Sequence, residues 1–424
     1  MITHPILSAA AAQGVRLGLG RLADFLGTLG HPERAFPAVH VAGTNGKGSV
    51  TRMVAAVFDA AGRRAGLTIS PHLQRVNERI VVAGAEIDDP SLDALLHELD
   101  AARAAWAAGQ GPILPADRAL TYFELTTAAA FLHFARQRVD IAAVEVGLGG
   151  RLDATNLVQP LSTAIVSIGL DHMEQLGPDE PFIAREKAGI FKPGVPAILG
   201  PLRPAARDAA AAIAASVGAP LWEPGRDYAV TPQPGGTFDW DGPGGALPGL
   251  RIALAGAHQV HNAAVAVALL RALPPAQRPS DAAIRAGLAA ATNPGRLERL
   301  GPRLLVDCAH NADGAAVLAD WLRATPAPPG GRTLLLGASA DKDLAAIAPA
   351  LAPLVDRIFT TACAHPRALA PDALQARLAA LGIDATPLGP IERALPAALS
   401  GPGEVLVAGS VFLAGAVRDL LPLP

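Results

Sequence analysis

The residues most suited to chemistry lie in a glycine-rich stretch near the N-terminus. It reads Gly43-Thr44-Asn45-Gly46-Lys47-Gly48-Ser49, follows a short apolar run at residues 38–42 and precedes a segment of helical character. Glycines let backbone N–H groups converge on phosphate oxygens, a helix N-terminus adds positive potential, and Lys47 supplies a mobile cation. The stretch departs from the common G-x-x-x-x-G-K-[ST] motif at two positions. Val41 stands where the motif has its first glycine, and Gly48 stands where it has serine or threonine after the lysine. We interpret it as a phosphate-binding loop.

Acidic and imidazole side chains accompany two further apolar runs. Glu145 stands in the run at residues 141–146, and Asp171 and His172 follow the run at residues 163–168. The carboxyl ends of parallel strands form the ligand-binding edge of an α/β sheet, where a carboxylate can hold Mg²⁺ against nucleotide phosphates. We therefore expect a metal and phosphate site at this edge, although each residue taken singly also fits a solvated strand end or a loop.

Three other segments are ambiguous by themselves. The glycines after Glu145 could be half of a dinucleotide fingerprint, but Leu152 occupies the last glycine of G-x-G-x-x-G, which argues against it. Ser70 stands in S-P-H, which fits a plain turn. Lys187, in R-E-K-A-G-I, fits one lysine on a solvated helix face. Whether these three segments have a functional role depends on the other motifs in the chain.

The apolar runs are continuous rather than alternating, which is typical of strands buried on both faces of a parallel sheet. We predict an α/β fold whose N-terminal domain, residues 1–294, is a parallel sheet of the phosphate-loop ATPase type. The Gly/Pro-rich segment between Tyr228 and Leu254 predicts a hairpin region at the edge of this domain.

The strand pattern restarts after Asn293-Pro294-Gly295, with runs at residues 303–307, 333–337 and 405–409. This predicts a smaller C-terminal Rossmann-like α/β domain, residues 295–424. Asp307 and His310 end its first run in D-C-A-H-N. Polar groups at a strand end beside a hinge suit a ligand shared between domains, although singly they are ordinary turn residues.

Composition restricts the partners of the chain. Its 35 basic and 38 acidic side chains give a formal net charge of −3, so we expect no binding to nucleic acid or to a membrane surface. Charge-free runs are too polar or too short for a membrane span. The two cysteines, Cys308 and Cys363, lack the spacing of a zinc or disulfide framework, which favours a reducing, cytoplasmic location.

The motifs occur together in the Mur-ligase superfamily, and the set resembles its bacterial folylpolyglutamate synthase/dihydrofolate synthase family. The matching stretches span nearly the whole chain: G-T-N-G-K-G-S (43–49), S-P-H-L (70–73), L-T-Y-F-E (120–124), E-V-G-L-G-G-R-L-D-A-T-N (145–156), D-H (171–172), R-E-K-A-G-I-F-K (185–192), H-Q-V-H-N (258–262), P-G-R (294–296) and D-C-A-H-N (307–311).

The resemblance implies an ATP-dependent ligase that adds L-glutamate to dihydropteroate and to reduced folates. A carboxylate is a poor electrophile, so its oxygen first takes the γ-phosphoryl group of ATP, and the amine of glutamate then displaces phosphate from the acyl phosphate. Both steps need water excluded. ATP as co-substrate, Mg²⁺ at two sites, partners limited to these small molecules and a monomeric state are further implications.

The resemblance also assigns roles to individual residues. The ATP-binding set is Thr44, Asn45, Gly46, Lys47, Gly48, Ser49, Asn262, Arg296 and Asp307. The Mg²⁺ ligands are Ser70, Glu145 and His172. The acceptor-binding set is Arg16, Leu17, Tyr122, Phe123, Leu152, Asp153 and Ala154. The catalytic set is Lys47, a carbamylated Lys187 and His310.

Three alternatives remain open. Arg16 stands where many bifunctional members carry Asp, so the chain could be a folylpolyglutamate synthase that extends reduced folates alone. A peptidoglycan Mur ligase would share the phosphate loop and the acyl phosphate, but residues 70–73 and 120–124 favour folate. A phosphate-loop switch or binding module would hydrolyse or retain nucleotide without making an amide.

Overall fold

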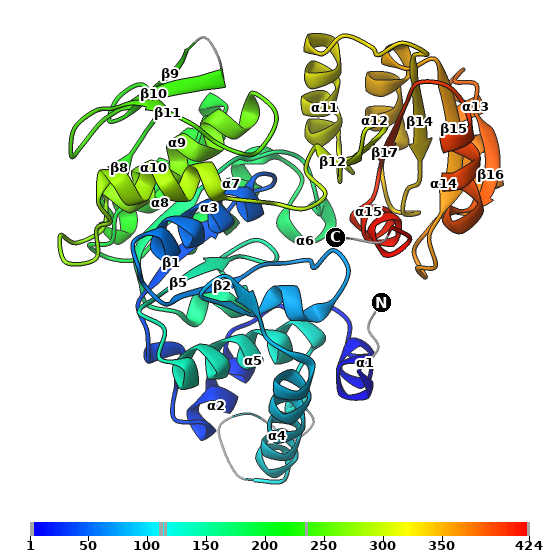
Figure 1. Cartoon of the computed structure of the whole chain (residues 1–424). Coiled ribbons are helices and arrows are strands. Elements are labelled where there is room, and N and C mark those ends of the chain that lie inside the picture. The colour runs from blue at the N-terminus through cyan, green and yellow to red at the C-terminus, as the bar shows by residue number, and fades with distance from the viewer. Residues whose placement is uncertain (1–3, 110–112, 114–116, 234–235, 422–424) are drawn as a thin grey trace. The chain divides into compact units, whose positions relative to one another are not determined.

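The structure, a computed structural model, describes residues 4–109, 113, 117–233 and 236–421. It divides into two compact units (Figure 1). Among the described residues, the larger unit comprises residues 4–253 and 259–292, and the smaller unit comprises residues 254–258 and 293–421.

The larger unit is built on a sheet that has eight strands in the described residues, in the order β4-β3-β2-β5-β1-β6-β7-β8. Its strands are β1 (Ala38–Ala42), β2 (Ala65–Thr68), β3 (Val81–Val82), β4 (Ala85–Glu86), β5 (Ile141–Glu145), β6 (Pro160–Ile165), β7 (Ala197–Leu199) and β8 (Leu221–Trp222). The strands from β2 to β8 in this order run parallel, and β3 and β4 continue the sheet antiparallel. The predicted runs at residues 38–42 and 141–146 are thus β1 and β5.

The third predicted run lies earlier in the chain than expected, because β6 ends at Ile165 rather than near residue 168. Beyond it, Ser167 turns to the glycine-rich loop, where its hydroxyl donates a hydrogen bond of 2.8 Å to the carbonyl oxygen of Asn45. Backbone bonds to β1 continue just past the end of β6, since the N–H of Val166 donates to the carbonyl oxygen of Ala42 (2.8 Å).

The helices of the larger unit pack on both faces of this sheet (Figure 1). They are α1 (Pro5–Ala11), α2 (Gly20–Thr28), α3 (Lys47–Ala60), α4 (Asp89–Ala108), α5 (Tyr122–Gln137), α6 (Met173–Leu176), α7 (Glu180–Ala188), α8 (Pro204–Val217), α9 (His258–Arg271) and α10 (Asp281–Ala290), with the 3-10 helices η1 (Pro32–Arg34), η2 (Val76–Arg79) and η4 (Ala154–Leu157). Helix α3 packs against β1, β2 and β5, and a core cluster joins α5 to α1, α2 and α4. In the ranges that the structure describes, no helix combines the length and the apolar character that a membrane crossing requires.

The start of α5 is fixed by a capping box that its sequence encodes. The backbone N–H of Glu124 donates to the hydroxyl of Thr121 (3.2 Å), and the N–H of Thr121 donates to the Glu124 carboxylate (2.8 Å). This reciprocal pair satisfies N–H groups that the first turn of a helix leaves without partners. The cap holds Tyr122 and Phe123 at the N-terminus of α5.

The predicted hairpin region forms a sheet of its own with the strands β9 (Ala229–Gln233), β10 (Thr237–Asp241) and β11 (Leu247–Leu250). Residues 234–235 of this region lie outside the described residues. The fully buried Trp240 of β10 donates from its Nε1 to the carbonyl oxygen of Ala264 in α9 (3.2 Å). This buried ring attaches the small sheet to α9 within the larger unit.

The smaller unit is a second α/β layer structure with the described strand order β12-β13-β17-β14-β15-β16. Its strands are β12 (Glu298–Gly301), β13 (Leu304–Val306), β14 (Arg332–Leu336), β15 (Arg357–Ala362), β16 (Thr386–Pro390) and β17 (Glu404–Ala408). Its helices are α11 (Ala312–Ala324), α12 (Leu344–Leu351), α13 (Pro371–Ala379), α14 (Ile391–Ser400) and α15 (Val411–Asp419), with the 3-10 helix η6 (Ala352–Leu354). Only β12 is antiparallel to its neighbour among the paired strands described.

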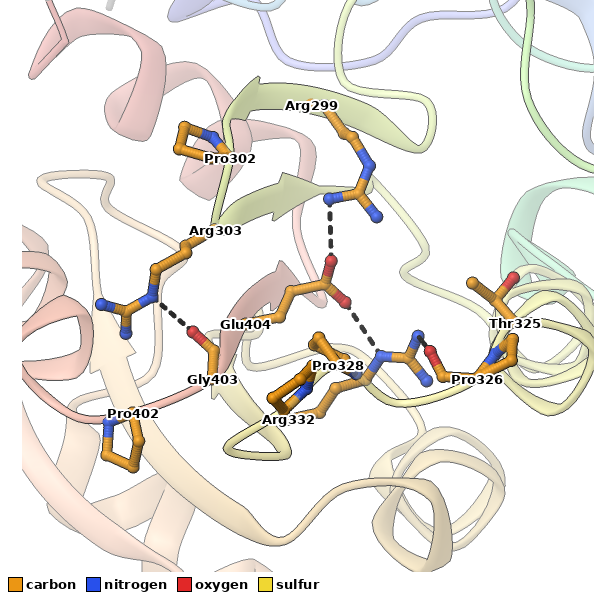
Figure 2. A pocket seen from close by; sticks show the side chains of 11 residues that line it. Arg299, Pro302, Arg303, Thr325, Pro326, Pro328, Arg332, Pro402, Gly403 and Glu404 are labelled. Atoms are coloured by element: carbon orange, nitrogen blue, oxygen red, sulfur yellow. Dashed lines mark hydrogen bonds and ion pairs between the residues drawn. The ribbon is translucent and has the colours of Figure 1, made fainter.

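A cavity of about 400 Å³ lies at the amino ends of β14 and β17 (Figure 2). Glu404 accepts from Arg332 Nε at 2.9 Å and pairs with Arg299 Nη1 at 2.8 Å, while Arg303 donates to the carbonyl oxygen of Gly403 at 2.6 Å. Arg332 and Glu404 are both buried, and their strands pair at these two residues. Because ligands of α/β sheets bind at the opposite, carboxyl ends of the strands, we interpret this network as structural.

Candidate active site

The sheet topology brings four predicted site segments to one edge of the larger sheet. Strand β1 pairs with β5 on one side and with β6 on the other, and β2 pairs with β5. These strands are parallel, so the segments that follow them leave the sheet at the same edge. They carry the glycine-rich loop at residues 43–49, Ser70, the segment after Glu145, and Asp171 with His172.

The glycine-rich loop is anchored to the segment that follows β6. The backbone N–H of Thr44 donates to the carbonyl oxygen of Ser167 (2.9 Å), and the Thr44 hydroxyl donates to that of Gly169 (3.1 Å). The backbone N–H of Asn45 donates to the hydroxyl of Ser167 (2.9 Å). These bonds fix the loop, so Thr44 and Asn45 hold its shape in addition to any contact with nucleotide.

Gly46 ends the loop as the N-cap of α3, in a left-handed conformation with φ 81°. A Cβ at this position would lie 2.6 Å from Oδ1 of Asn262 on α9. The loop and Asn262, both predicted to bind ATP, are therefore neighbours. The first N–H groups of a helix lack partners within it, so the α3 N-terminus, with Lys47, Gly48 and Ser49, presents donors and positive potential to a phosphate.

Two lysines meet at one carbonyl oxygen of the loop. Nζ of Lys47 and Nζ of Lys187 each lie 3.0 Å from the carbonyl oxygen of Gly43. Lys187, on α7, is only 4% exposed. Burial, reinforced by the charge of Lys47, lowers the pKa of Lys187 to about 7, and the carboxylates of Asp171 and Asp153 oppose this shift. Lys187 is therefore not the solvated surface lysine that its local sequence permits.

The three predicted metal ligands lie at the ends of three strands of this edge, with Glu145 the last residue of β5 and Ser70 and His172 beyond β2 and β6. The backbone N–H of Ser70 donates to the buried Glu145 carboxylate at 3.1 Å. The Ser70 hydroxyl is buried and has no hydrogen-bond partner among the described residues. His172 is about half exposed, with its Nε2 4.0 Å from the Asp171 carboxylate. A buried oxygen without a partner beside a carboxylate suits a hard cation such as Mg²⁺, so Ser70 and Glu145 fit a metal.

We expect Ser70→Ala to raise the Mg²⁺ concentration needed for half-maximal activity by about tenfold or more, because it removes one oxygen ligand. The unfolding free energy should change by no more than about 0.5 kcal/mol, because that hydroxyl makes no bond within the described protein. Ser162→Ala is a matched control, since the Ser162 hydroxyl on β6 is also buried and has no hydrogen-bond partner in the described part of the chain. An unchanged Mg²⁺ requirement in Ser70→Ala would contradict the ligand assignment.

The sequence prediction missed two arginines near Glu145, of which Arg79 is buried and Arg52 is half-buried. Burial lowers the pKa of Arg52 and of Arg79, and the charge of Glu145 is among those that raise both. Nε of Arg79 donates to Nδ1 of His72 (2.9 Å), and its guanidinium lies 5.1 Å from the centre of the Tyr122 ring. Arg52 lies on the helix that begins at Lys47, but no spacing rule distinguishes either arginine from a surface residue.

The predicted acceptor residues Tyr122 and Phe123 pack beside the glycine stretch. A Cβ on Gly147 would lie 2.4 Å from the Phe123 ring, so this position must be glycine for the ring to lie there. The Tyr122 hydroxyl is buried and has no hydrogen-bond partner among the described residues. Because buried hydroxyls are normally bonded, this atom is available to a ligand.

Asp153 has a structural role in the same segment. Its buried carboxylate accepts from the N–H of Leu148 (2.8 Å), the N–H of Thr155 (2.9 Å) and the hydroxyl of Thr155 (2.5 Å). The Thr155 hydroxyl also lies 2.9 Å from Nε2 of the fully buried His40, another residue that the sequence prediction missed. The side chain of Asp153 thus holds Leu152 and Ala154 in place.

The N-terminal loop with Arg16 and Leu17 also reaches this segment. The N–H of Gly18 donates to the carbonyl oxygen of Leu152 (3.3 Å), which joins two parts of the predicted acceptor set. Nη2 of Arg16 pairs with the Asp117 carboxylate at 3.0 Å. The Leu17 side chain remains exposed. Arg16 therefore has a carboxylate partner within the chain.

Arg296, Asp307 and His310 come together within the smaller unit. The Asp307 carboxylate accepts from the N–H of Leu297 (2.9 Å) and from the N–H of Ala309 (2.8 Å). Burial raises its pKa, and the charge of Arg296 opposes that shift. Nδ1 of His310 lies 2.8 Å from the carbonyl oxygen of Cys308. These bonds orient the turn after β13.

Two family models match the chain over most of its length. The Mur ligase middle domain matches residues 41–270, and the Mur ligase glutamate ligase domain matches residues 295–411. The chain belongs to the Mur ligase family.

Relatives of this Mur ligase place it among the folate enzymes of the family. It is 38% identical over 381 residues to the dihydrofolate synthase/folylpolyglutamate synthase of Mycobacterium tuberculosis, covering 84% of this chain and 76% of the relative. It is 34% identical over 416 residues to the folylpolyglutamate synthase of Lacticaseibacillus casei, covering 95% and 94%.

Solved structures agree with this placement of the Mur ligase. The structure of Escherichia coli FolC in complex with DHPP and ADP matches with a TM-score of 0.87 and 34% identity, and the match covers 99% of this chain and 98% of FolC. A bifunctional folylpolyglutamate synthase/dihydrofolate synthase with Mn, AMPPNP and L-glutamate bound matches with a TM-score of 0.85 and 32% identity, covering 99% of each chain. The predicted α/β fold is confirmed.

Proposed function

We propose that this Mur ligase adds L-glutamate to dihydropteroate and to reduced folates, with ATP converted to ADP and phosphate by way of an acyl phosphate. The observation that carries the proposal is the edge of the larger sheet, where a phosphate loop, two lysines on one carbonyl and the Ser70 and Glu145 pair converge. The names of its relatives support the folate acceptor. The DHPP, nucleotide, manganese and L-glutamate in the matching structures support these substrates and a divalent cation.

In this proposal the larger unit activates the acceptor carboxylate. The N-terminus of α3 and Lys47 bind the ATP phosphates, and Lys47 balances the negative charge that develops as the γ-phosphoryl group moves to the carboxylate oxygen. Mg²⁺ at two sites, held by Ser70, Glu145 and His172 with a carbamylated Lys187, would neutralise phosphate charge. Arg52 and Arg79 balance the charge of Glu145 in the protein interior.

The acceptor lies, in this proposal, against the residues on and around α5. Phe123 and Leu152 offer apolar surface for its aromatic part, and the Tyr122 hydroxyl offers a hydrogen bond. Gly147 allows the Phe123 ring to approach the backbone. Arg296, Asp307 and His310 bind ATP or act in the second half of the reaction, in which the amine of glutamate attacks the acyl phosphate and phosphate leaves.

We further propose that the enzyme acts as a cytoplasmic monomer. Both cysteines are free, which suits a reducing compartment. The near-neutral charge supports small-molecule substrates rather than nucleic acid or membrane.

Product analysis with purified protein tests the proposal. We expect ADP formation to require both an acceptor and L-glutamate, with a glutamylated product from dihydropteroate and from tetrahydrofolate. Glutamate added to tetrahydrofolate alone would reduce the assignment to a folylpolyglutamate synthase. Activity with nucleotide-sugar peptides would indicate a peptidoglycan ligase, and ATP hydrolysis without either substrate would indicate a switch. The Lys47→Ala variant, purified in the same way, is the control for ADP formation by contaminating enzymes.

A further inference from the structure

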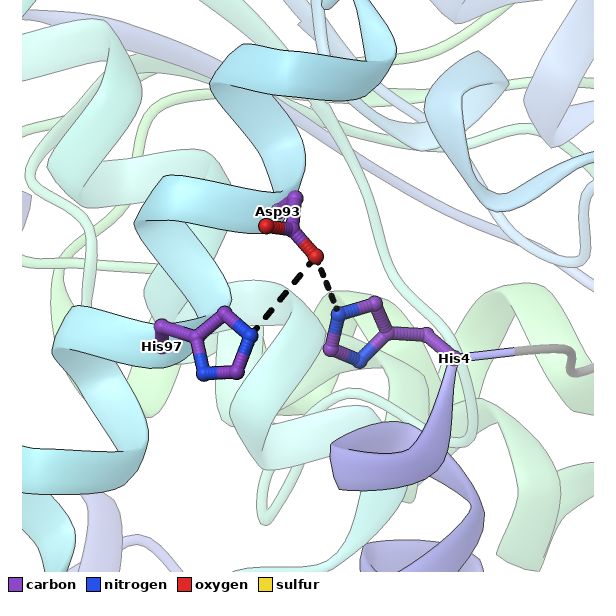
Figure 3. A group of neighbouring side chains, drawn as sticks. All are labelled: His4, Asp93 and His97. Atoms are coloured by element: carbon purple, nitrogen blue, oxygen red, sulfur yellow. Dashed lines mark hydrogen bonds and ion pairs between the residues drawn. The ribbon is translucent and has the colours of Figure 1, made fainter.

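Two histidines and an aspartate meet on the surface of the larger unit, at the junction of α1 and α4 (Figure 3). Nε2 of His4 lies 3.1 Å from Oδ1 of Asp93, and Nε2 of His97 lies 3.7 Å from the same oxygen. Their ligating atoms all lie within 4.8 Å of one another. The proposed active site uses none of these three residues.

The two helices present these side chains in an arrangement suited to chelation. Asp93 and His97 are four residues apart on α4, so they project from the same helix face. His4 is the N-cap of α1 and approaches that face from a position 89 residues away in the sequence. Figure 3 shows both imidazole rings directed toward the Asp93 carboxylate.

The donor set determines the chemical class of ligand. Two imidazole nitrogens and one carboxylate oxygen suit Zn²⁺ and similar divalent transition metals, whereas Mg²⁺ and Ca²⁺ prefer oxygen ligands. Donors held about 2.0–2.2 Å from one Zn²⁺ lie closer to one another than the 3.7 Å between Nε2 of His97 and Oδ1 of Asp93. The His97 side chain is 68% exposed, so it can rotate inward without disturbing the core.

We propose that His4, Asp93 and His97 form a binding site for a divalent transition metal of the Zn²⁺ class, with further positions open to solvent. The metal joins the start of α1 to the second turn of α4. Helix α1 leads into the loop that bears Arg16 and Leu17, and the N–H of Gly18 in this loop bonds to Leu152. Metal binding at His4 therefore strengthens the attachment of the segment that precedes the proposed acceptor site.

Zn²⁺ titration of the full chain tests the site. The measurement is Zn²⁺ bound per chain after gel filtration, in excess Mg²⁺ and ATP so that the proposed active-site ligands are occupied. We expect one Zn²⁺ in the parent and an affinity lower by at least about tenfold in Asp93→Asn, His97→Asn and His4→Asn, because each loses one of three ligands. Thermal unfolding should shift upward with Zn²⁺ in the parent and not in these variants.

His31→Asn is the matched control. His31 also pairs with a carboxylate, that of Glu33 at 2.9 Å, but the described residues place no third ligand beside this pair. Asparagine tolerates the left-handed φ of 58° at this position. This variant should bind Zn²⁺ as the parent does. Zn²⁺ binding and thermal shift that persist in all three cluster variants, or a parent that binds none, would overturn the proposal and leave Asp93 as a hydrogen-bond partner of His4 and an ion-pair partner of His97. Because Asp93 and His97 are exposed, a folding defect will not confuse the result.

Discussion

Lys47→Ala is expected to lower kcat/KM for ATP by about 10²- to 10³-fold, which corresponds to about 3–4 kcal/mol of transition-state stabilisation. In the structure the Lys47 ammonium donates to the carbonyl oxygens of Gly43 (3.0 Å) and Thr44 (3.1 Å). These contacts hold it over the loop at the N-terminus of α3, where it can follow the phosphate. Alanine keeps good helix propensity at the first position of α3, so the loss should be in rate rather than in folding.

Initial rates of ADP formation and thermal unfolding, measured on the same preparations, separate the two effects. Arg63→Gln is a surface-cation control, since the Arg63 guanidinium donates to the carbonyl oxygen of Ala276 in an exposed contact. It should retain the rate of the parent. A Lys47→Ala enzyme with activity within a few fold of the parent would exclude Lys47 from the phosphate site.

The second large effect is expected at Lys187, which we propose to be carbamylated. Its neutral amine would attack CO₂, forming an N–C bond and releasing one proton, to give a carboxylate-like group. Burial and the charge of Lys47 lower the pKa of Lys187 from 10.5 to about 7, so the amine is mostly neutral above pH 7 and mostly protonated below it. Carbamylation should therefore be favoured above pH 7 and be lost as the pH falls below it.

Lys187→Ala should lower kcat by about 10²-fold or more, because the carbamate would orient a ligand of the second metal. Added formate or acetate should restore part of the activity by occupying the vacated space. The same carboxylates should not rescue Lys47→Ala, which serves as the control. Mass spectrometry or ¹³C NMR with labelled bicarbonate would detect the adduct directly.

The alternative is that Lys187 acts as a plain amine bonded to the Gly43 carbonyl oxygen. In that case labelled bicarbonate would leave no signal in the ATP and Mg²⁺ complex at pH 8, and carboxylates would not rescue the alanine variant. Either finding, with the alanine variant still folded, would remove the carbamate from the proposed mechanism.

The sequence by itself determined the fold class and the location of the phosphate loop. Continuous apolar runs mark parallel strands because both faces of such strands are buried, and this pattern is local. The run at residues 38–42 followed by G-T-N-G-K-G-S is likewise a local signal, since the strand, the turn and the helix start are adjacent in the chain. The capping box at Thr121 and Glu124 can also be read directly from T-Y-F-E.

The tertiary structure decided how the distant residues act. Lys187 reads as a surface lysine in its own helix, and only packing against the loop 144 positions away buries it on the Gly43 carbonyl oxygen. Ser70 lies beside the Glu145 carboxylate because β2 pairs with β5. Burial lowers the pKa of Arg79, and the nearby charge of Glu145 is among those that oppose this shift. The burial and electrostatic environment of a residue depend on which segments are in contact, and strand order and helix packing determine those contacts. A local sequence pattern contains neither.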